Sequence, residues 1–128
     1  MGRGSIIAVV ATDAPLLPHE LKRIARRVGM GLGKLGSWAG NGSGDLFLAF
    51  STANAGASQA KDLATKLEMI PNDTIDPLFR ATIEATEESV VNAMLAAPAV
   101  STGVDGIRIH GLPGARVVEV LKKYGRMR

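Results

Sequence analysis

The sequence predicts a layered α/β fold, and three patterns along the chain support that prediction. Two short apolar runs, Ile6–Ala11 and Leu46–Phe50, contain no polar residue, which is typical of strands that are covered on both faces. Between them, residues 19–35 place apolar side chains at helical spacing, and residues 76–97 do so again. Strands covered on both faces require a helix layer or another sheet on each side, so we expect a layered α/β sandwich.

Local signals set the ends of the two long helices. Pro15 and Pro18 interrupt the first extended run, so the first helix is expected to begin at His19. Asp76 followed by Pro77 is an N-cap with proline at the first helical position, which predicts where the second helix begins. The first helix ends in a glycine-rich stretch with glycine at positions 29, 31 and 33, which predicts close packing against another backbone.

The remaining segments give weaker signals. Residues 61–70 fit a helix by propensity and a strand by alternation, and the strand is slightly favoured. A short strand is expected at Ile107–Ile109, and a last helix at residues 115–124 with inward-facing valines and a leucine, namely Val117, Val118, Val120 and Leu121. No repeat or linker divides the chain, so residues 1–128 are expected to form a single domain, with Met1–Gly4 as a residual upstream segment.

The composition excludes several classes of protein and site. With 46% hydrophobic residues, the 128-residue chain is expected to fold around a core rather than stay disordered. The absence of cysteine excludes disulfides, thiolate zinc sites and cysteine nucleophiles, and only two histidines are present, so no metal or cofactor is expected. The apolar run of six residues is far shorter than the roughly 18 that span a bilayer. We therefore expect no membrane segment, with the cytoplasm as the default location.

The basic charge of the chain raises the question of nucleic-acid binding. Fifteen lysines and arginines exceed twelve aspartates and glutamates, which gives a net charge of +3. The excess gathers on one predicted helix and at the C-terminus, and aromatic residues that could stack on bases make up only 4% of the chain. A solvated helix face is the favoured interpretation, so no nucleic-acid partner is expected.

Gly4-Ser5, at the entry to the first strand, is the residue pair whose possible chemistry is the most distinctive. A serine hydroxyl held against the preceding carbonyl can attack it, and hydrolysis of the resulting ester makes serine a new N-terminus with its own amine as general base. A conventional triad assembled from Ser101, Asp105 and His110 has no geometric support in the sequence. His19 is expected to be a surface or packing residue.

Three strings in the sequence resemble a known enzyme family. They are GSIIAVVATDAPLLPHELKRIARR, GNGSGDLFLAFSTAN and DPLFRATIEATEESVVNAML. They are similar to the C-terminal part of the DmpA-type aminopeptidases, the family of the L-aminopeptidase/D-esterases and β-peptidyl aminopeptidases, and the similarity runs from Gly4 to the C-terminus. The resemblance implies an αββα sandwich of the N-terminal-nucleophile type, present here as its smaller, β-chain part.

The resemblance also implies roles for individual residues. A precursor of this family cleaves itself before serine, which makes Gly4–Ser5 the autocleavage bond and Ser5 the nucleophile. Ser43 and Asp45 match positions that the family uses beside that serine, and some members carry glutamate where Asp45 stands. A relay is implied in which Asp45 orients Ser43 and Ser43 contacts the Ser5 hydroxyl. The surrounding turn, with Asn41, Gly42 and Gly44, supports this pair and approaches Ser5.

As a β-chain part, the chain is expected to require an α region of the same precursor for activity. The implied substrates are peptides and amino-acid amides or esters, hydrolysed through an acyl-enzyme on Ser5, in an assembly that is a homo-oligomer. Two alternatives remain open at this point. One is an acyltransferase of the ornithine-acetyltransferase kind, which uses threonine as its nucleophile; the other is a non-catalytic remnant or interaction module. In the 128-residue chain alone, the Gly4–Ser5 bond is expected to stay intact.

Overall fold

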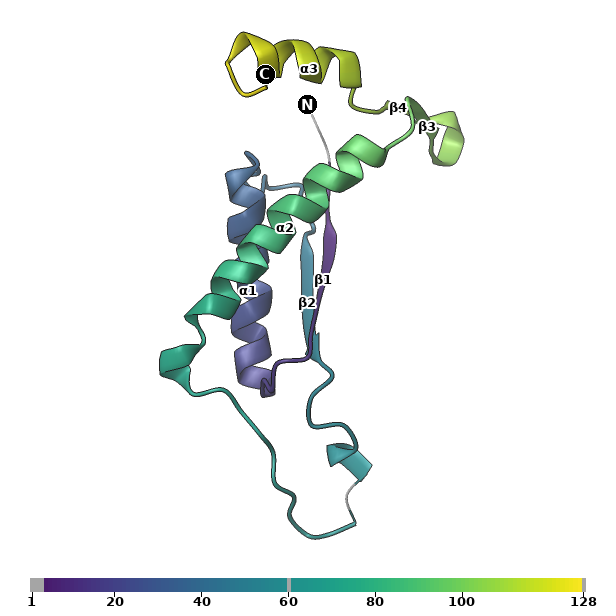
Figure 1. Ribbon diagram of the computed structural model, residues 1–128. Helices are drawn as coiled ribbons and strands as arrows, with labels where there is room; N and C mark the ends of the chain where they lie inside the picture. Colours follow the sequence, from purple (N-terminus) through teal and green to yellow (C-terminus); the bar gives the residue numbers. More distant parts are fainter. Residues whose placement is uncertain (1–3, 60, 128) are drawn as a thin grey trace. The chain divides into compact units, whose positions relative to one another are not determined.

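The computed structural model describes residues 4–59 and 61–127, which form two compact units (Figure 1). The first unit extends to Glu87 and contains β1 (Ile7–Thr12), α1 (Pro18–Lys34), β2 (Leu46–Ser51) and the first half of α2 (Asp76–Ala96). The second unit contains the rest of α2, β3 (Val100–Thr102), β4 (Arg108–His110) and α3 (Gly114–Lys123). Of the expected upstream segment, Met1–Arg3 lies outside the described residues.

In the first unit, β1 and β2 pair in parallel and α1 connects them. The register runs from Ile7 opposite Leu46 to Thr12 opposite Ser51. Both predicted strands and the predicted helix are confirmed, each displaced by no more than one residue at its start. Because the strands are parallel, the segments that lead into them lie at the same edge of the sheet.

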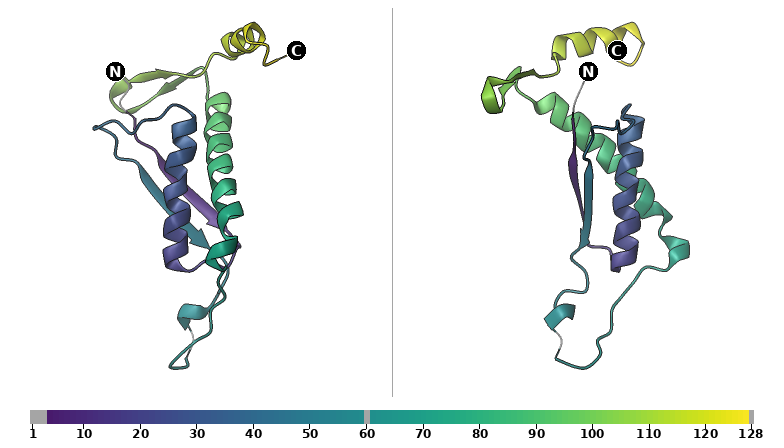
Figure 2. Two further views of the ribbon diagram at one scale, coloured as in Figure 1. Left: turned by 90° about the vertical axis from the view of Figure 1, so that its left-hand side faces the viewer. Right: turned by 180° about the vertical axis from the view of Figure 1, so that it is seen from behind.

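The core of the first unit lies on one face of this sheet, between the strands and the helices. Leu16, Ile24, Ile75 and Phe79 form its buried centre. Val10 and Ala49 approach it from the two strands. Two views of the ribbon show α1 along that face and the first half of α2 beside α1 (Figure 2).

The close packing predicted for the glycines of the first helix is found at one of them. A Cβ added to Gly31 would lie 2.8 Å from the Ile83 carbonyl oxygen and 2.8 Å from the Thr86 Cβ. Gly31 therefore lets α1 approach the backbone of α2. At Gly33 the same added atom would meet nothing within 4 Å, so the prediction is wrong there.

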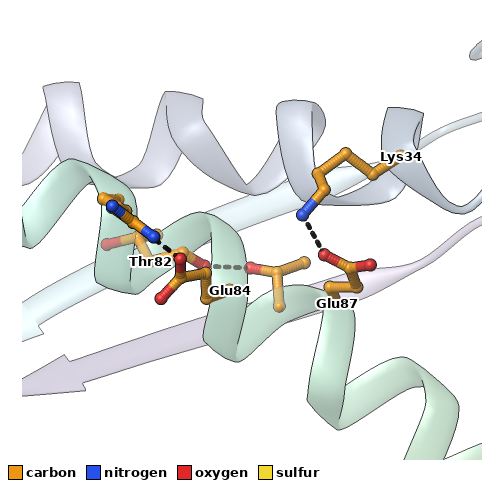
Figure 3. A network of polar contacts seen from close by, with 6 residues as sticks. Lys34, Thr82, Glu84 and Glu87 are labelled. Atoms are coloured by element: carbon orange, nitrogen blue, oxygen red, sulfur yellow. Dashed lines mark hydrogen bonds and ion pairs between the residues drawn. The ribbon is translucent and has the colours of Figure 1, made fainter.

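Polar contacts link the same two helices (Figure 3). An ion pair joins Lys34 at the end of α1 to Glu87 on α2. Within α2, the Thr82 hydroxyl donates to the Leu78 carbonyl oxygen at 2.7 Å, which satisfies a hydroxyl on the buried side of the helix. The buried face of α2 is thus partly polar, as is that of α1, where Glu20 is fully buried.

The other face of the β1–β2 sheet is exposed, which corrects the expectation of strands covered on both faces. Exposure alternates along both strands, and the exposed set consists of large apolar side chains, namely Ile7, Val9, Leu46, Leu48 and Phe50. A half-covered strand is normally polar on its open side. The two continuous apolar runs therefore reflect a second face that the described residues leave open.

The strand favoured for residues 61–70 is not formed, and the segment contains no helix either. Its C-terminal end is held by other contacts. The Asn54 side chain accepts a hydrogen bond from the Glu68 backbone N–H at 2.8 Å and donates one to its carbonyl at 3.0 Å. The backbone N–H of Ile70 donates to the Pro15 carbonyl at 3.0 Å. Since these bonds involve single residues, the segment returns to the core without joining a sheet.

The basic face of α1 is partly engaged by the core. The Arg27 guanidinium stacks on the Phe79 ring at 3.7 Å from its centroid, and Arg23 lies over the same ring at 4.9 Å. Arg23 also donates a hydrogen bond to the Asn72 side chain at 2.6 Å. These two cations cover an aromatic side chain, as expected for a structural helix face.

In the second unit, β3 and β4 pair antiparallel and α3 follows them. The predicted strand and last helix are confirmed within one residue at each start, whereas β3 was not predicted. The inward direction expected for the apolar residues of the last helix is wrong, because no residue of α3 is buried. Among the described residues, no helix is long and apolar enough to cross a membrane.

Candidate active site

The candidate site lies where the chain enters the two parallel strands. Ser5 precedes β1, and Ser43, Gly44 and Asp45 precede β2. The backbone N–H of Leu46 donates to the Ile6 carbonyl at 2.9 Å and extends the strand pairing to this edge. Residues separated by about forty positions in the sequence are therefore side by side.

The Ser5 hydroxyl is exposed and accepts a hydrogen bond from the backbone. The donor is the N–H of Gly44, 2.9 Å from Ser5 Oγ. A backbone N–H directed at this oxygen fixes the position of the hydroxyl and favours negative charge on it. The relay expected from the sequence placed Ser43 in contact with Ser5; in the structure Ser43 contacts Asp45, and Gly44 makes the contact to Ser5.

Asp45 connects the strand that follows Ser5 to the turn before β2. Its Oδ1 accepts a hydrogen bond from the Ser43 hydroxyl at 2.6 Å and another from the Ile6 backbone N–H at 3.0 Å. The Ser43 bond, and then the Ile6 bond, lower the pKa of Asp45 below its ordinary value. The carboxylate is thus ionised at neutral pH, and it holds the peptide N–H of the residue after Ser5.

A tight turn places Ser43 and Gly44. The Ser43 backbone N–H donates to the Gly40 carbonyl at 2.8 Å, so Asn41 and Gly42 lie at the tip of a four-residue turn and are exposed. A Cβ on Gly42 would meet nothing within 4 Å, and one on Gly44 would lie 3.7 Å from Ser5 Oγ, an ordinary contact. The Gly44 N–H therefore makes the contact to Ser5. The space around Gly42 and Gly44 would accommodate a side chain at either position.

A hollow of about 650 Å³ opens beside Ser5. The loop of residues 36–45 forms most of its wall, together with Ile6 and Leu32. Trp38, the only tryptophan of the chain, lines the hollow and is 83% exposed. Sequence reasoning missed Trp38 and the Gly44 N–H; the position of Trp38 inside the serine- and glycine-rich loop was the available signal for the first.

The remaining sequence candidates belong to other parts of the chain. Ser101, Asp105 and His110 belong to the second unit and are exposed, and no hydrogen bond between them is found in the described chain. His19 lies in the first turn of α1, beyond the opposite end of β1 from Ser5. Over residues 4–59 and 61–127, no three histidine, aspartate or glutamate side chains form a group that could hold a metal ion.

Comparison with known proteins identifies the family of the chain. A family model described as peptidase family S58 matches residues 1–108. The chain belongs to peptidase family S58. Among curated S58 relatives, it is 48% identical over 126 residues to the β-peptidyl aminopeptidase BapA of Sphingosinicella microcystinivorans, covering 98% of this chain and 32% of that protein. The chain thus spans about a third of the length of the curated relatives it matches.

Solved structures confirm the fold. The L-aminopeptidase D-Ala-esterase/amidase of Ochrobactrum anthropi, described as a prototype for the serine aminopeptidases and a variant of the Ntn hydrolase fold, aligns with a TM-score of 0.86 and 42% identity. The alignment covers 97% of this chain and 35% of that one. A β-aminopeptidase of Burkholderia sp. aligns with a TM-score of 0.80 and 39% identity, over 98% and 36% of the two chains. The predicted family and the α/β fold, as part of a DmpA-like sandwich, are both confirmed.

Proposed function

We propose that this S58 chain is the nucleophile-bearing part of a serine aminopeptidase, which releases N-terminal residues from peptides, amides or esters. One observation carries the proposal: the Gly44 N–H donates to the exposed Ser5 hydroxyl, while the adjoining Asp45 carboxylate holds the peptide N–H that follows Ser5. This is the arrangement expected of a fixed nucleophile beside a donor for developing charge. Three of the similar proteins, a β-peptidyl aminopeptidase, an L-aminopeptidase and a β-aminopeptidase, support it further.

The proposed enzyme first cleaves its own backbone. Ser5 Oγ attacks the Gly4 carbonyl carbon, the bond from that carbon to the Ser5 nitrogen breaks, and an ester forms while the nitrogen takes up the hydroxyl proton. Water then hydrolyses the ester, leaving a carboxylate on Gly4 and a free α-amine and hydroxyl on Ser5. The free amine, with an unperturbed pKa of about 7.7–8.0, can serve as the general base for Ser5.

Turnover follows the same chemistry with an external carbonyl. Ser5 Oγ attacks the substrate carbonyl, its proton passes to the α-amine and then to the leaving amine, and an acyl-enzyme remains for water to hydrolyse. Ser43 and Asp45 act on this reaction by position. The Asp45 carboxylate fixes both the Ser43 hydroxyl and the Ile6 N–H, and so holds the Gly44 N–H against Ser5 Oγ.

The proposed partner is an α region of the same precursor. The relatives are about three times longer than this chain, which matches 32% and 30% of two of them. The exposed apolar face of the β1–β2 sheet is the surface on which a second layer of the sandwich would pack. We propose a homo-oligomer for the complete assembly.

The test joins the chain to a matching α region and measures hydrolysis of a chromogenic aminoacyl amide. Ser5→Ala is expected to abolish turnover without changing assembly, because no acyl-enzyme can form. Ser43→Ala and Asp45→Asn are expected to lower kcat by up to about 10²-fold, because the Gly44 N–H is then held less firmly against Ser5 Oγ. Intact mass of the acylated protein identifies the modified residue.

Two exposed histidines supply the matched controls. His19→Ala and His110→Ala are expected to leave turnover nearly unchanged, whereas a conventional triad requires a histidine. A histidine variant that abolishes turnover in folded protein, with Ser5→Ala still active, would overturn the proposal. If Ser5-dependent turnover never appears with an α region supplied, a non-catalytic module is indicated; transfer of the acyl group to an amine in place of water would indicate the acyltransferase.

A further inference from the structure

The wall of the hollow beside Ser5 contains a large aromatic side chain that the proposed chemistry leaves unused. Trp38 is the only aromatic residue among the hollow's lining residues, and 83% of its surface is exposed. Tryptophan exposes a large apolar area, and such area at a concave surface is a common feature of ligand sites. Because this area lies next to the proposed nucleophile, it can contact a substrate bound there.

The loop itself holds the indole in place. A Cβ at Gly40 would lie 3.6 Å from Trp38 Cη2 and 3.7 Å from Cζ2, so the six-membered ring rests against the Gly40 backbone. Ala39 between them has a φ of 47°, in the left-handed region that few alanines adopt. This bend turns Trp38 back over its own loop, and the same Gly40 closes the turn that carries Ser43. The indole and the nucleophile's supporting turn therefore belong to one structural unit.

The chemistry of the remaining wall indicates what Trp38 can bind. Leu32 and Ile6 add further apolar surface to the lining. Asp45 is the only charged residue among the lining residues, and its Oδ1 is already occupied by two donors. This wall therefore suits an uncharged, apolar part of a substrate better than its ammonium group.

We propose that Trp38 is a specificity-determining residue, which selects substrates with an aromatic or other large apolar group next to the scissile bond. This inference rests on the proposed function of Ser5. The favoured group stacks on the exposed part of the indole while the scissile carbonyl lies at Ser5 Oγ. Aromatic pairing of this kind corresponds to a preference of about three- to tenfold over a methyl group.

The kinetic test uses the chain joined to an α region and compares kcat/KM for three substrates. Phenylalanine amide carries the ring on the acyl side, alanine anilide carries it on the leaving side, and alanine amide carries none. Trp38→Ala is expected to lower the ratio of one aromatic substrate to alanine amide by about three- to tenfold, while Trp38→Phe retains most of it. The substrate whose ratio falls identifies the side of the scissile bond that Trp38 contacts.

Met30→Ala is the matched control, since Met30 is a large apolar residue on α1 that is 59% exposed and does not line the hollow. It should leave both ratios unchanged. If Trp38→Ala leaves both ratios unchanged in an enzyme that still depends on Ser5, the inference is wrong while the proposed function stands. An α region that covers Trp38 would give this result.

A binding measurement separates the two proposals if no turnover is found. As the sole tryptophan, Trp38 is a specific fluorescence reporter in the 128-residue chain. Phenylalanine amide is expected to change its emission saturably, at concentrations where alanine amide has no effect. Equal responses to both amides, or none to either, would overturn the inference whatever the outcome at Ser5.

Discussion

A single carboxylate oxygen organises the residues around Ser5. Asp45 Oδ1 receives both the Ser43 hydroxyl and the Ile6 N–H, at 2.6 and 3.0 Å. The shorter side chain of aspartate, where some family members carry glutamate, is long enough because Asp45 stands immediately before β2, opposite the residue that leads into β1. The carboxylate consequently holds both the backbone that follows Ser5 and the turn beside it.

The charge of Asp45 gives a prediction for the pH dependence of the joined enzyme. Its pKa is lowered by Ser43 and by the Ile6 N–H, so its contribution is present above the ordinary carboxyl range and is lost only as pH falls through the lowered pKa. Between pH 6 and 9 Asp45 stays ionised, and kcat/KM should rise as the Ser5 α-amine, with a pKa of about 7.7–8.0, loses its proton. Asp45→Asn should lower the plateau without moving this limb; a limb that disappears in the variant would contradict the assignment.

At this scale the sequence predicted the members of the site better than their contacts. Ser5, Ser43 and Asp45 were identified through the family resemblance and lie together, but their catalytic roles stay predictions. The contact to Ser5 from the Gly44 N–H depends on the direction of a backbone group, which residue types do not specify. Trp38 lies in the hollow because of the conformation of its loop, which includes the left-handed Ala39. The periodicity of the sequence does not predict a loop conformation of this kind.

At the scale of elements, spacing predicted the helices and failed for the irregular connection. The apolar period of α1 and the Asp76-Pro77 start of α2 are local signals, and both helices form where expected. The alternation over residues 61–70 is equally local, yet a strand also needs a partner. That segment is held instead by Asn54 and by the Pro15 carbonyl. These residues are distant in the sequence, so local patterns do not predict the contacts.

The crossing of α1 and α2 gives a prediction with its control on the same helix. Gly31→Ala would place a methyl group 2.8 Å from the Ile83 carbonyl oxygen, so the helices must move apart at a cost of about 1–3 kcal/mol. Gly33→Ala meets nothing within 4 Å and should stabilise the helix by up to about 1 kcal/mol. Thermal unfolding followed by circular dichroism measures both. A Gly31→Ala protein as stable as Gly33→Ala would mean that the two helices are not in contact at this point.

At the scale of the whole molecule, the first unit supplies the β1–β2 sheet and the helices on one of its faces. The continuous apolar runs indicated covered strands, and the relatives' greater length supports the proposal that an α region supplies the second layer. Sequence patterns record the burial of the complete protein, so they cannot tell which residues supply the cover. The same reasoning applies to α3, whose apolar residues were expected to point inward and are not buried.

Self-cleavage should depend on the proposed α region. A Cβ on Gly4 would meet nothing within 4 Å, so the described residues leave the space on that side of Gly4 open. We expect the Gly4–Ser5 bond of the 128-residue chain to remain intact on incubation, as measured by intact mass. Discrete loss of residues 1–4, absent in Ser5→Ala, would show instead that the chain cleaves itself without help.

The open sheet face should also make the isolated chain associate. Ile7, at 76% exposed, Leu46, at 63%, and Leu48, at 58%, lie on neighbouring strands and form part of a contiguous apolar surface. Such surfaces in water favour self-association, and burial contributes about 25 cal/mol per Å² of apolar area. Light scattering on the 128-residue chain is expected to show oligomers or aggregates.

A charge on that surface should reverse the effect, because a buried lysine without a partner opposes association. Leu48→Lys is therefore expected to increase the monomer fraction at a given concentration. Leu63→Lys makes the same change at a fully exposed leucine in the connection after β2, outside the sheet, and should have a smaller effect. If both variants dissociate the oligomer equally, net charge governs association; a wild-type chain that stays monomeric over a wide range of concentrations would show that its helices and loops suffice to keep the sheet face in solution.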